Sequence, residues 1–132
     1  MALNQIEALR EENRRGRTIL ACERFDLDPV LGPVVKQLTK ARRNKSLRKT
    51  TIKYEYEINA LLNYFEQLAI GAKQGDYSRE IMCSYLDLIM QEWREELIDS
   101  KVCAKIGSPT PKYFSEFVAL CDDLANQKTT NG

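Results

Sequence analysis

Six apolar residues in the middle of the chain recur with the period of an α-helix. They are Tyr54, Ile58, Leu61, Phe65, Leu68 and Ala72. This alternation of four- and three-residue steps places all six on one face, as expected of a helix that packs against other helices. We therefore expect a helix over residues 52–73. Gly75 follows it, in the position where glycine commonly closes a helix.

The N-terminal segment predicts a helix with an interrupted apolar face. Leu3, Ile6 and Leu9 share one side, a highly charged stretch follows, and apolar residues return only at Ile19. Gly16 lies between the two parts and weakens a helix by about 1 kcal/mol relative to alanine. We interpret residues 1–25 as a charged, amphipathic helical arm that self-associates or binds a partner through Leu3, Ile6 and Leu9.

Capping signals mark the starts of three further helices. Asp28 followed by Pro29 is typical of a helix start, and Thr110 followed by Pro111 repeats the pattern near the C-terminus. Either Asp76 or Ser78 caps a helix that we expect to be the most buried. The helices expected between the arm and the last helix cover residues 29–43, 52–73 and 76–100.

The fold class follows from these patterns. No stretch of useful length alternates apolar and polar residues as a strand would, so we expect an all-α fold, a small bundle of four to five helices. The bundle would span residues 26–126, and the polar residues 127–132 would form a frayed tail. A chain of 132 residues is suited to one core of this kind.

Charge is divided unequally along the chain. Residues 1–53 contain thirteen lysines and arginines against six acidic residues, a local net charge of +7. Residues 54–132 contain seven against thirteen, a local net charge of −6, so the halves sum to the overall +1. Each half therefore favours partners of opposite charge, and the two halves can also serve as partners for each other.

The basic half is densest over residues 36–53, where eight cations occur in eighteen residues without an acidic residue. This density can neutralise several phosphates, so nucleic-acid binding is one hypothesis. The segment lacks interleaved aromatic residues for base stacking, and a solvated connection or contact with an acidic protein surface explains it as well. The candidate partner-binding residues are Lys40, Arg42, Arg43, Lys45, Arg48, Lys49 and Lys53.

The residue types in the chain give little support for a catalytic function. The chain has no histidine, which removes the commonest general base and transition-metal ligand. Its six glycines do not form a phosphate-binding loop. The acidic residues Glu92, Glu95, Glu96 and Asp99 are interpreted as a solvated helix face, and Cys103 is the one thiol away from an apolar stripe. We expect a non-enzymatic chain with no metal and no cofactor.

The expected location is cytoplasmic. No apolar run reaches the roughly 20 residues that cross a bilayer, and the N-terminus lacks the apolar stretch of a signal peptide. The four cysteines, Cys22, Cys83, Cys103 and Cys121, form no CxxC pair. We interpret them as free thiols in a reducing compartment.

The second half of the chain combines an asparagine, aromatic and acidic run, a glycine turn, an acidic helix start, a tryptophan and an aromatic last helix. These features are Asn63, Phe65, Glu66, Gly71, Gly75, Asp76, Trp93, Tyr113 and Phe117. Through them, residues 17–125 resemble the bacterial family called domain of unknown function 4760. The resemblance implies a bacterial or phage setting. Some members carry an N-terminal membrane helix, where this chain has its charged arm.

Two pairs of these residues have both a binding and a structural interpretation. Asn63 and Glu66 could bind a ligand, or they could cap a neighbouring segment, and the structural interpretation is favoured. Phe65 and Trp93 are expected in the core. As a whole, the sequence predicts a self-associating protein-interaction module of bacterial or phage origin. The alternatives are a nucleic-acid-binding protein and a phage or mobile-element inhibitor of a host complex.

Overall fold

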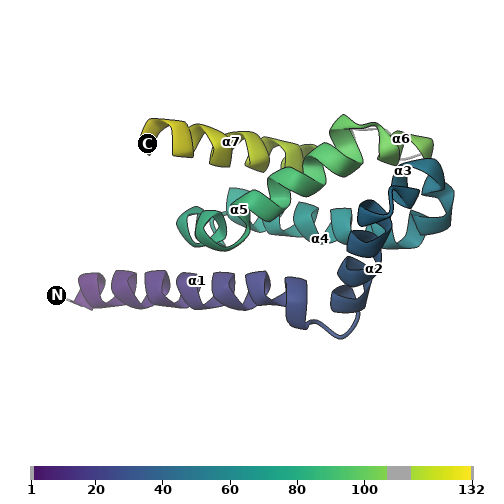
Figure 1. The fold of residues 1–132 in the computed structure, drawn as a ribbon. Helices are drawn as coiled ribbons and strands as arrows, with labels where there is room; N and C mark the ends of the chain where they lie inside the picture. The colour runs from purple at the N-terminus through teal and green to yellow at the C-terminus, as the bar shows by residue number, and fades with distance from the viewer. Residues whose placement is uncertain (1, 107–113, 132) are drawn as a thin grey trace.

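The computed structural model describes residues 2–106 and 114–131, which are helical apart from short turns (Figure 1). Its elements are α1 (Ala2–Leu27), α2 (Leu31–Arg43), α3 (Ser46–Lys49), the 3-10 helix η1 (Thr51–Tyr54), α4 (Glu55–Lys73), α5 (Arg79–Arg94), the π-helical segment η2 (Glu95–Asp99), α6 (Val102–Lys105) and α7 (Ser115–Asn131). The all-α class is confirmed. The described part contains seven α-helices rather than four to five, because α3 and α6 are four-residue helices where connections were expected.

The core is built around α4, which contacts both α2 and α7. All six residues of the central apolar seam, from Tyr54 to Ala72, are buried as predicted. Three phenylalanines from three helices stack through its middle. The Phe25 and Phe65 rings are 6.0 Å apart at 20°, and the Phe65 and Phe117 rings are 4.9 Å apart at 14°. These contacts join α1, α4 and α7 into one hydrophobic core.

The turn after α4 has the form expected of a glycine-terminated helix. Gly75 has a φ of +82°, its N–H bonds to the carbonyl of Ala72, and the N–H of Asp76 bonds to the carbonyl of Gly71. This pair of bonds is the Schellman arrangement, which favours glycine at its left-handed position. Gly71 is required for a different reason, since a Cβ there would lie 2.3 Å from the ring of Tyr77.

The helix after this turn is capped by Ser78, one of the two residues proposed for that role. The Ser78 hydroxyl oxygen accepts a hydrogen bond from the N–H of Ile81 at 3.3 Å. The expectation that this helix is the most buried is wrong. α5 leaves Tyr85 and Leu88 half or more exposed and has six buried residues, against eight in α4.

α1 is one continuous helix of 26 residues, and its two halves have different surroundings. Thr18, Ala21, Cys22 and Phe25 are buried against the bundle, whereas every described side chain before Arg14 is exposed. In Figure 1 these first turns project beyond α5. The second half of the segment that we interpreted as an arm is therefore part of the core.

Two further expectations concern the C-terminal region. α7 continues through residues 127–131, where a frayed tail was expected. The expected cap Thr110, with Pro111 and Tyr113, lies outside the described residues. Within the described ranges, the helices lack the combination of length and apolar character that crossing a membrane requires.

Candidate interaction surfaces

The face of α1 turned away from the bundle carries a row of exposed apolar side chains. Leu3, Ile6 and Leu9 are 71%, 47% and 58% exposed, and Leu20 and Leu27 continue the row at 67% and 74%. The sequence interpretation identified the first three and missed the other two. Their spacing of seven residues was the signal that could have revealed them.

Four of these five residues have the spacing of a coiled-coil seam, and Leu3 lies beside it at an e position. Ile6, Leu20 and Leu27 fall on the a positions of one heptad register, and Leu9 falls on a d position. The buried residues Thr18, Ala21, Cys22 and Phe25 fall on its b, c and f positions, on the opposite side of the helix. α1 therefore has two separate apolar faces, and one of them contacts the bundle.

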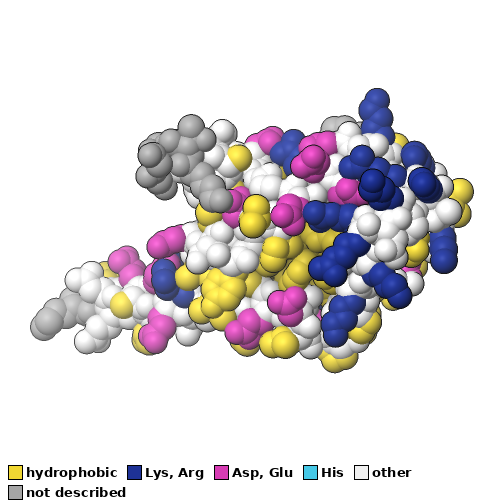
Figure 2. All heavy atoms as spheres, in the orientation of Figure 1, with side chains coloured by type: hydrophobic (Ala, Val, Ile, Leu, Met, Phe, Trp, Pro, Cys, Tyr) yellow, Lys and Arg dark blue, Asp and Glu magenta, His cyan; other side chains and the backbone are white. Residues whose placement is uncertain are grey.

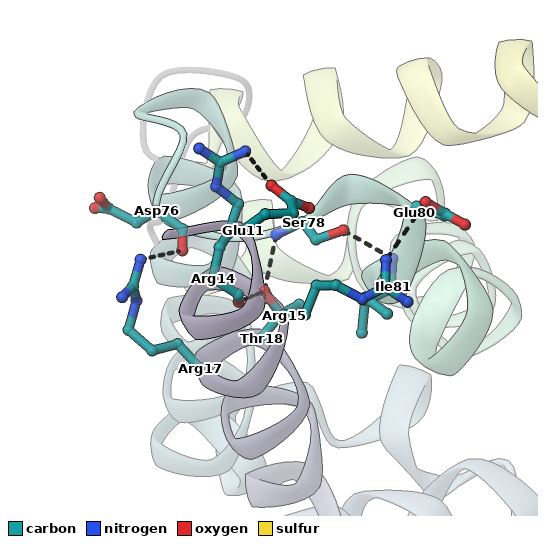
Figure 3. A network of polar contacts seen from close by, with 9 residues as sticks. All are labelled: Glu11, Arg14, Arg15, Arg17, Thr18, Asp76, Ser78, Glu80 and Ile81. Carbon is teal, nitrogen blue, oxygen red and sulfur yellow. Dashed lines mark hydrogen bonds and ion pairs between the residues drawn. The ribbon is translucent and has the colours of Figure 1, made fainter. Parts of the chain in front are cut away.

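A polar network attaches the middle of α1 to the start of α5 (Figure 3). The Thr18 hydroxyl oxygen accepts a hydrogen bond from the Ser78 N–H at 2.8 Å and donates one to the Arg14 carbonyl at 2.6 Å. Arg17 donates to the Asp76 carbonyl at 3.4 Å, and Arg15 lies 3.8 Å from a Glu80 carboxylate oxygen. Glu11, in the projecting segment, pairs with Arg14 of the same helix at 3.0 Å, and the contacts with the region at the start of α5 begin at Arg15.

The basic stretch does not form one uniform surface. Arg42 lies over the Trp93 ring, 5.4 Å from its centroid, and 3.7 Å from a Glu92 carboxylate oxygen. Arg48 donates two hydrogen bonds to the Glu96 carboxylate, at 3.0 and 3.2 Å. These two arginines pair the basic half of the chain with its acidic half. Some of the opposite charges of the two halves therefore neutralise each other within the fold.

Most of the acidic residues between positions 92 and 99 take part in ion pairs. Glu92 and Glu96 face the two arginines, and Asp99 lies 3.6 Å from Arg94. No group of three metal-ligating side chains exists among residues 2–106 and 114–131. The arrangement is that of a helix face held by ion pairs.

A second part of the basic stretch surrounds a hollow of about 540 Å³. Lys36 and Lys40 contribute from α2 and Lys53 from η1, with Ser46 and Tyr54 also in the lining. In Figure 2 most lysine and arginine side chains gather at the end of the molecule formed by α2 and α3.

Three more of the proposed partner-binding residues do not line that hollow. Arg43 lines a separate hollow of about 300 Å³ together with Arg42 and Trp93. Lys45 and Lys49 are exposed on the turn before α3 and on α3 itself. Of the seven proposed residues, the structure therefore brings only Lys40 and Lys53 together around the larger hollow.

The thiols are poorly suited to nucleophilic chemistry. Burial raises the pKa of Cys22 to about 11 and that of Cys121 to about 12. Cys103 is fully buried, although it lies away from the apolar stripes of the sequence, and Cys83 is half-buried. Because the thiolate is the reactive form, a raised pKa and burial both lower reactivity at neutral pH.

Glu66 has the structural role favoured above. Its Oε1 accepts a hydrogen bond from the N–H of Phe117 at 2.7 Å, in the first turn of α7. Asn63 is exposed and lines a shallow hollow of about 270 Å³ beside Tyr64. Phe65 and Trp93 are buried, as expected of core residues.

Comparison with known protein families assigns the chain to one of them. The family model described as Domain of unknown function (DUF4760) matches residues 1–123. The chain belongs to this family. The match begins at residue 1, so it includes the first part of the charged arm, which lay outside the resemblance seen at residues 17–125. No curated protein and no solved structure matches the chain.

Proposed function

We propose that this chain is a non-enzymatic protein-interaction module that associates with a second copy of itself through the outer face of α1. The observation that carries the proposal is the exposed row from Ile6 to Leu27 on the face opposite the core. Isolated helices of about 12 residues are marginal in water, so the projecting first half of α1 gains stability from a partner helix.

The occupant best suited to this face is an identical helix. A heptad seam packs by placing its own a and d side chains between those of a matching seam. Asn13, Gly16 and Glu23 occupy the remaining inner positions after residue 6, so the seam is only partly apolar. We therefore expect a dimer with a dissociation constant on the order of micromolar.

The charges beside the seam favour a parallel pair. Arg10, Arg17 and Arg24 occupy successive e positions, and Glu12 occupies a g position. In a parallel pair a g residue faces the e residue five positions later on the other helix, which brings Glu12 beside Arg17 of the second copy. Arg17 donates to the Asp76 carbonyl through one guanidinium nitrogen, and its other N–H groups can reach the Glu12 carboxylate. An antiparallel pair would instead bring the e rows together, with arginine facing arginine.

The proposal is tested by light scattering after size exclusion, over a range of protein concentrations. We expect a monomer–dimer equilibrium for the unchanged chain and a monomer for the triple variant Ile6→Gln, Leu9→Gln and Leu20→Gln. The matched control replaces two exposed apolar residues elsewhere, Ile52→Gln and Leu88→Gln, and should dimerise normally. A monomer at every concentration, or equal loss in the control, would contradict the proposal.

The orientation is tested separately by disulfide crosslinking. Asn13→Cys places a thiol at an a position, where the two copies of a parallel pair meet. We expect a crosslinked dimer from this variant and none from Glu7→Cys, which lies outside the seam. If the Asn13→Cys variant dimerises without forming the crosslink, self-association stands and the parallel alignment is rejected.

A further inference from the structure

We infer that the hollow lined by Lys36, Lys40 and Lys53 binds a small ligand carrying a diphosphate or triphosphate group. This inference is independent of the self-association of α1. The hollow, at about 540 Å³, lies within the size range of about 300–1,000 Å³ typical of small-molecule sites.

Three positive side chains from two elements line this one space. Lys36 and Lys40 lie one turn apart on α2, and Lys53 belongs to η1, which follows α3. None of the three forms an ion pair with a carboxylate in the described part of the chain. Arg42 and Arg48 are both paired with carboxylates, whereas these three lysines are not, and the Lys53 ammonium lies over the Tyr54 ring, 5.6 Å from its centroid. The three charges can therefore be neutralised by an external anion.

Neutral hydrogen-bonding groups accompany the charges. The hydroxyl oxygens of Ser46 and Tyr54 lie 3.4 Å apart, and both residues line the hollow. Asn44 adds an amide at the end of α2. The Ser46 hydroxyl donates to the Ala41 carbonyl at 3.2 Å, so its contact with Tyr54 is donated by the tyrosine. The donors toward phosphate oxygens are therefore the ammonium groups and the Asn44 amide, and the two hydroxyls contribute a polar lining.

A local structural role explains only part of this arrangement. Lys40 lies in the last turn of α2, where a cation interacts favourably with the helix dipole. That effect needs no third lysine from η1 and no hollow between the two elements. Three lysine charges match the charge of a diphosphate or triphosphate better than that of a single phosphate.

The distribution of the other cations favours a compact ligand over an extended nucleic acid. Binding along a strand needs a continuous row of cations that follows the backbone. Here Arg42 and Arg43 line a different hollow beside Trp93, and Arg48 is paired with Glu96. The cations that remain around the hollow therefore form a small cluster instead of a track.

The test uses inorganic pyrophosphate, ATP and inorganic phosphate as probes, with calorimetry for affinity and amide NMR shifts for location. We expect saturable one-site binding of pyrophosphate or ATP, weaker binding of phosphate, and shifts centred on Asn44, Ser46 and Tyr54. The double variant Lys40→Gln and Lys53→Gln should lose at least about tenfold in affinity. ATP binding much more tightly than pyrophosphate would identify a nucleotide as the ligand.

The matched control removes two charges from the same stretch outside the hollow, with Lys45→Gln and Lys49→Gln. We expect its affinity to stay within about threefold of the unchanged chain at physiological salt, because exposed charges are screened. Equal losses in the two double variants, or no saturable binding, would overturn the inference. Tighter binding of a single-stranded oligonucleotide that depends equally on Lys45 and Lys49 would overturn it in favour of nucleic acid.

Discussion

The backbone N–H of Ser78 donates a hydrogen bond of 2.8 Å to the hydroxyl oxygen of Thr18, 60 residues earlier in the chain. Both residues are buried. Ser78 also caps α5, so the same residue closes the start of one helix and fixes it to the side of another. This contact sets the point at which α1 leaves the bundle and its projecting segment begins.

Replacing Thr18 by valine should lower the free energy of unfolding by about 1–3 kcal/mol. Valine keeps the shape of threonine but leaves the Ser78 N–H buried without its acceptor. Urea unfolding at pH 7 measures the effect. Thr39→Val is the matched control, since the Thr39 hydroxyl donates to the Val35 carbonyl within its own helix and no buried donor is left unpaired. Equal losses for the two variants would contradict this assignment.

Replacing Glu66 by alanine should destabilise the fold by about 1 kcal/mol, the usual cost of removing a helix cap. The reason is the loss of the acceptor for the Phe117 N–H in the first turn of α7. Glu66→Gln retains an oxygen acceptor and should recover most of the stability. Thermal unfolding of both variants measures the difference. If glutamine is as damaging as alanine, the negative charge and not the hydrogen bond is what matters.

Two glycine-to-alanine substitutions should have opposite effects. Gly75→Ala forces alanine into a φ of +82°, which should cost about 1 kcal/mol. Gly16→Ala adds a methyl group where no atom lies within 4 Å and should stabilise α1 by up to about 1 kcal/mol. Chemical unfolding at low protein concentration, where α1 is not paired, compares them. If both substitutions stabilise the fold, or both destabilise it, the description of α1 as a continuous helix with Gly16 on its open side is contradicted.

Alkaline pH should destabilise the fold through its buried thiols. The pKa values of Cys22 and Cys121 are about 11 and 12 in the folded chain, against 9.0 for an exposed thiol. The folded state thus holds these protons more tightly than the unfolded state, so stability is full below pH 9 and falls as pH rises towards 12. Unfolding curves between pH 8 and 11 test this. A Cys22→Ala, Cys121→Ala variant should show a smaller loss over the same range.

The helices could be predicted where the sequence carries an unambiguous period or a dedicated terminator. The seam around Phe65 and the glycine at position 75 are examples. The short helices were missed because the turns before them use lysine in the left-handed region, Lys45 at φ 59° and Lys101 at φ 65°. Glycine or asparagine is the usual signal for that conformation, and lysine gives none.

The candidate surfaces were predictable only in part. Leu3, Ile6 and Leu9 stood out because they are the only large apolar residues between positions 2 and 18, whereas Leu20 lies next to the core residue Ala21 and looked like part of one face. For the basic stretch, the partners of Arg48 and Arg42 lie about 50 residues away in sequence, at Glu96 and Glu92. Such pairings depend on tertiary packing, so local pattern could not separate the paired arginines from the unpaired lysines.

The stacked phenylalanines have a consequence for how the chain is made. Phe65 lies between Phe25 and Phe117, so its second face stays uncovered until α7 has been synthesised. At translation rates of about 5–20 residues per second, the 52 residues separating it from Phe117 take roughly 3–10 s to appear. During that interval the nascent chain presents an incomplete aromatic core, the kind of exposed apolar surface that makes unfinished chains prone to aggregate.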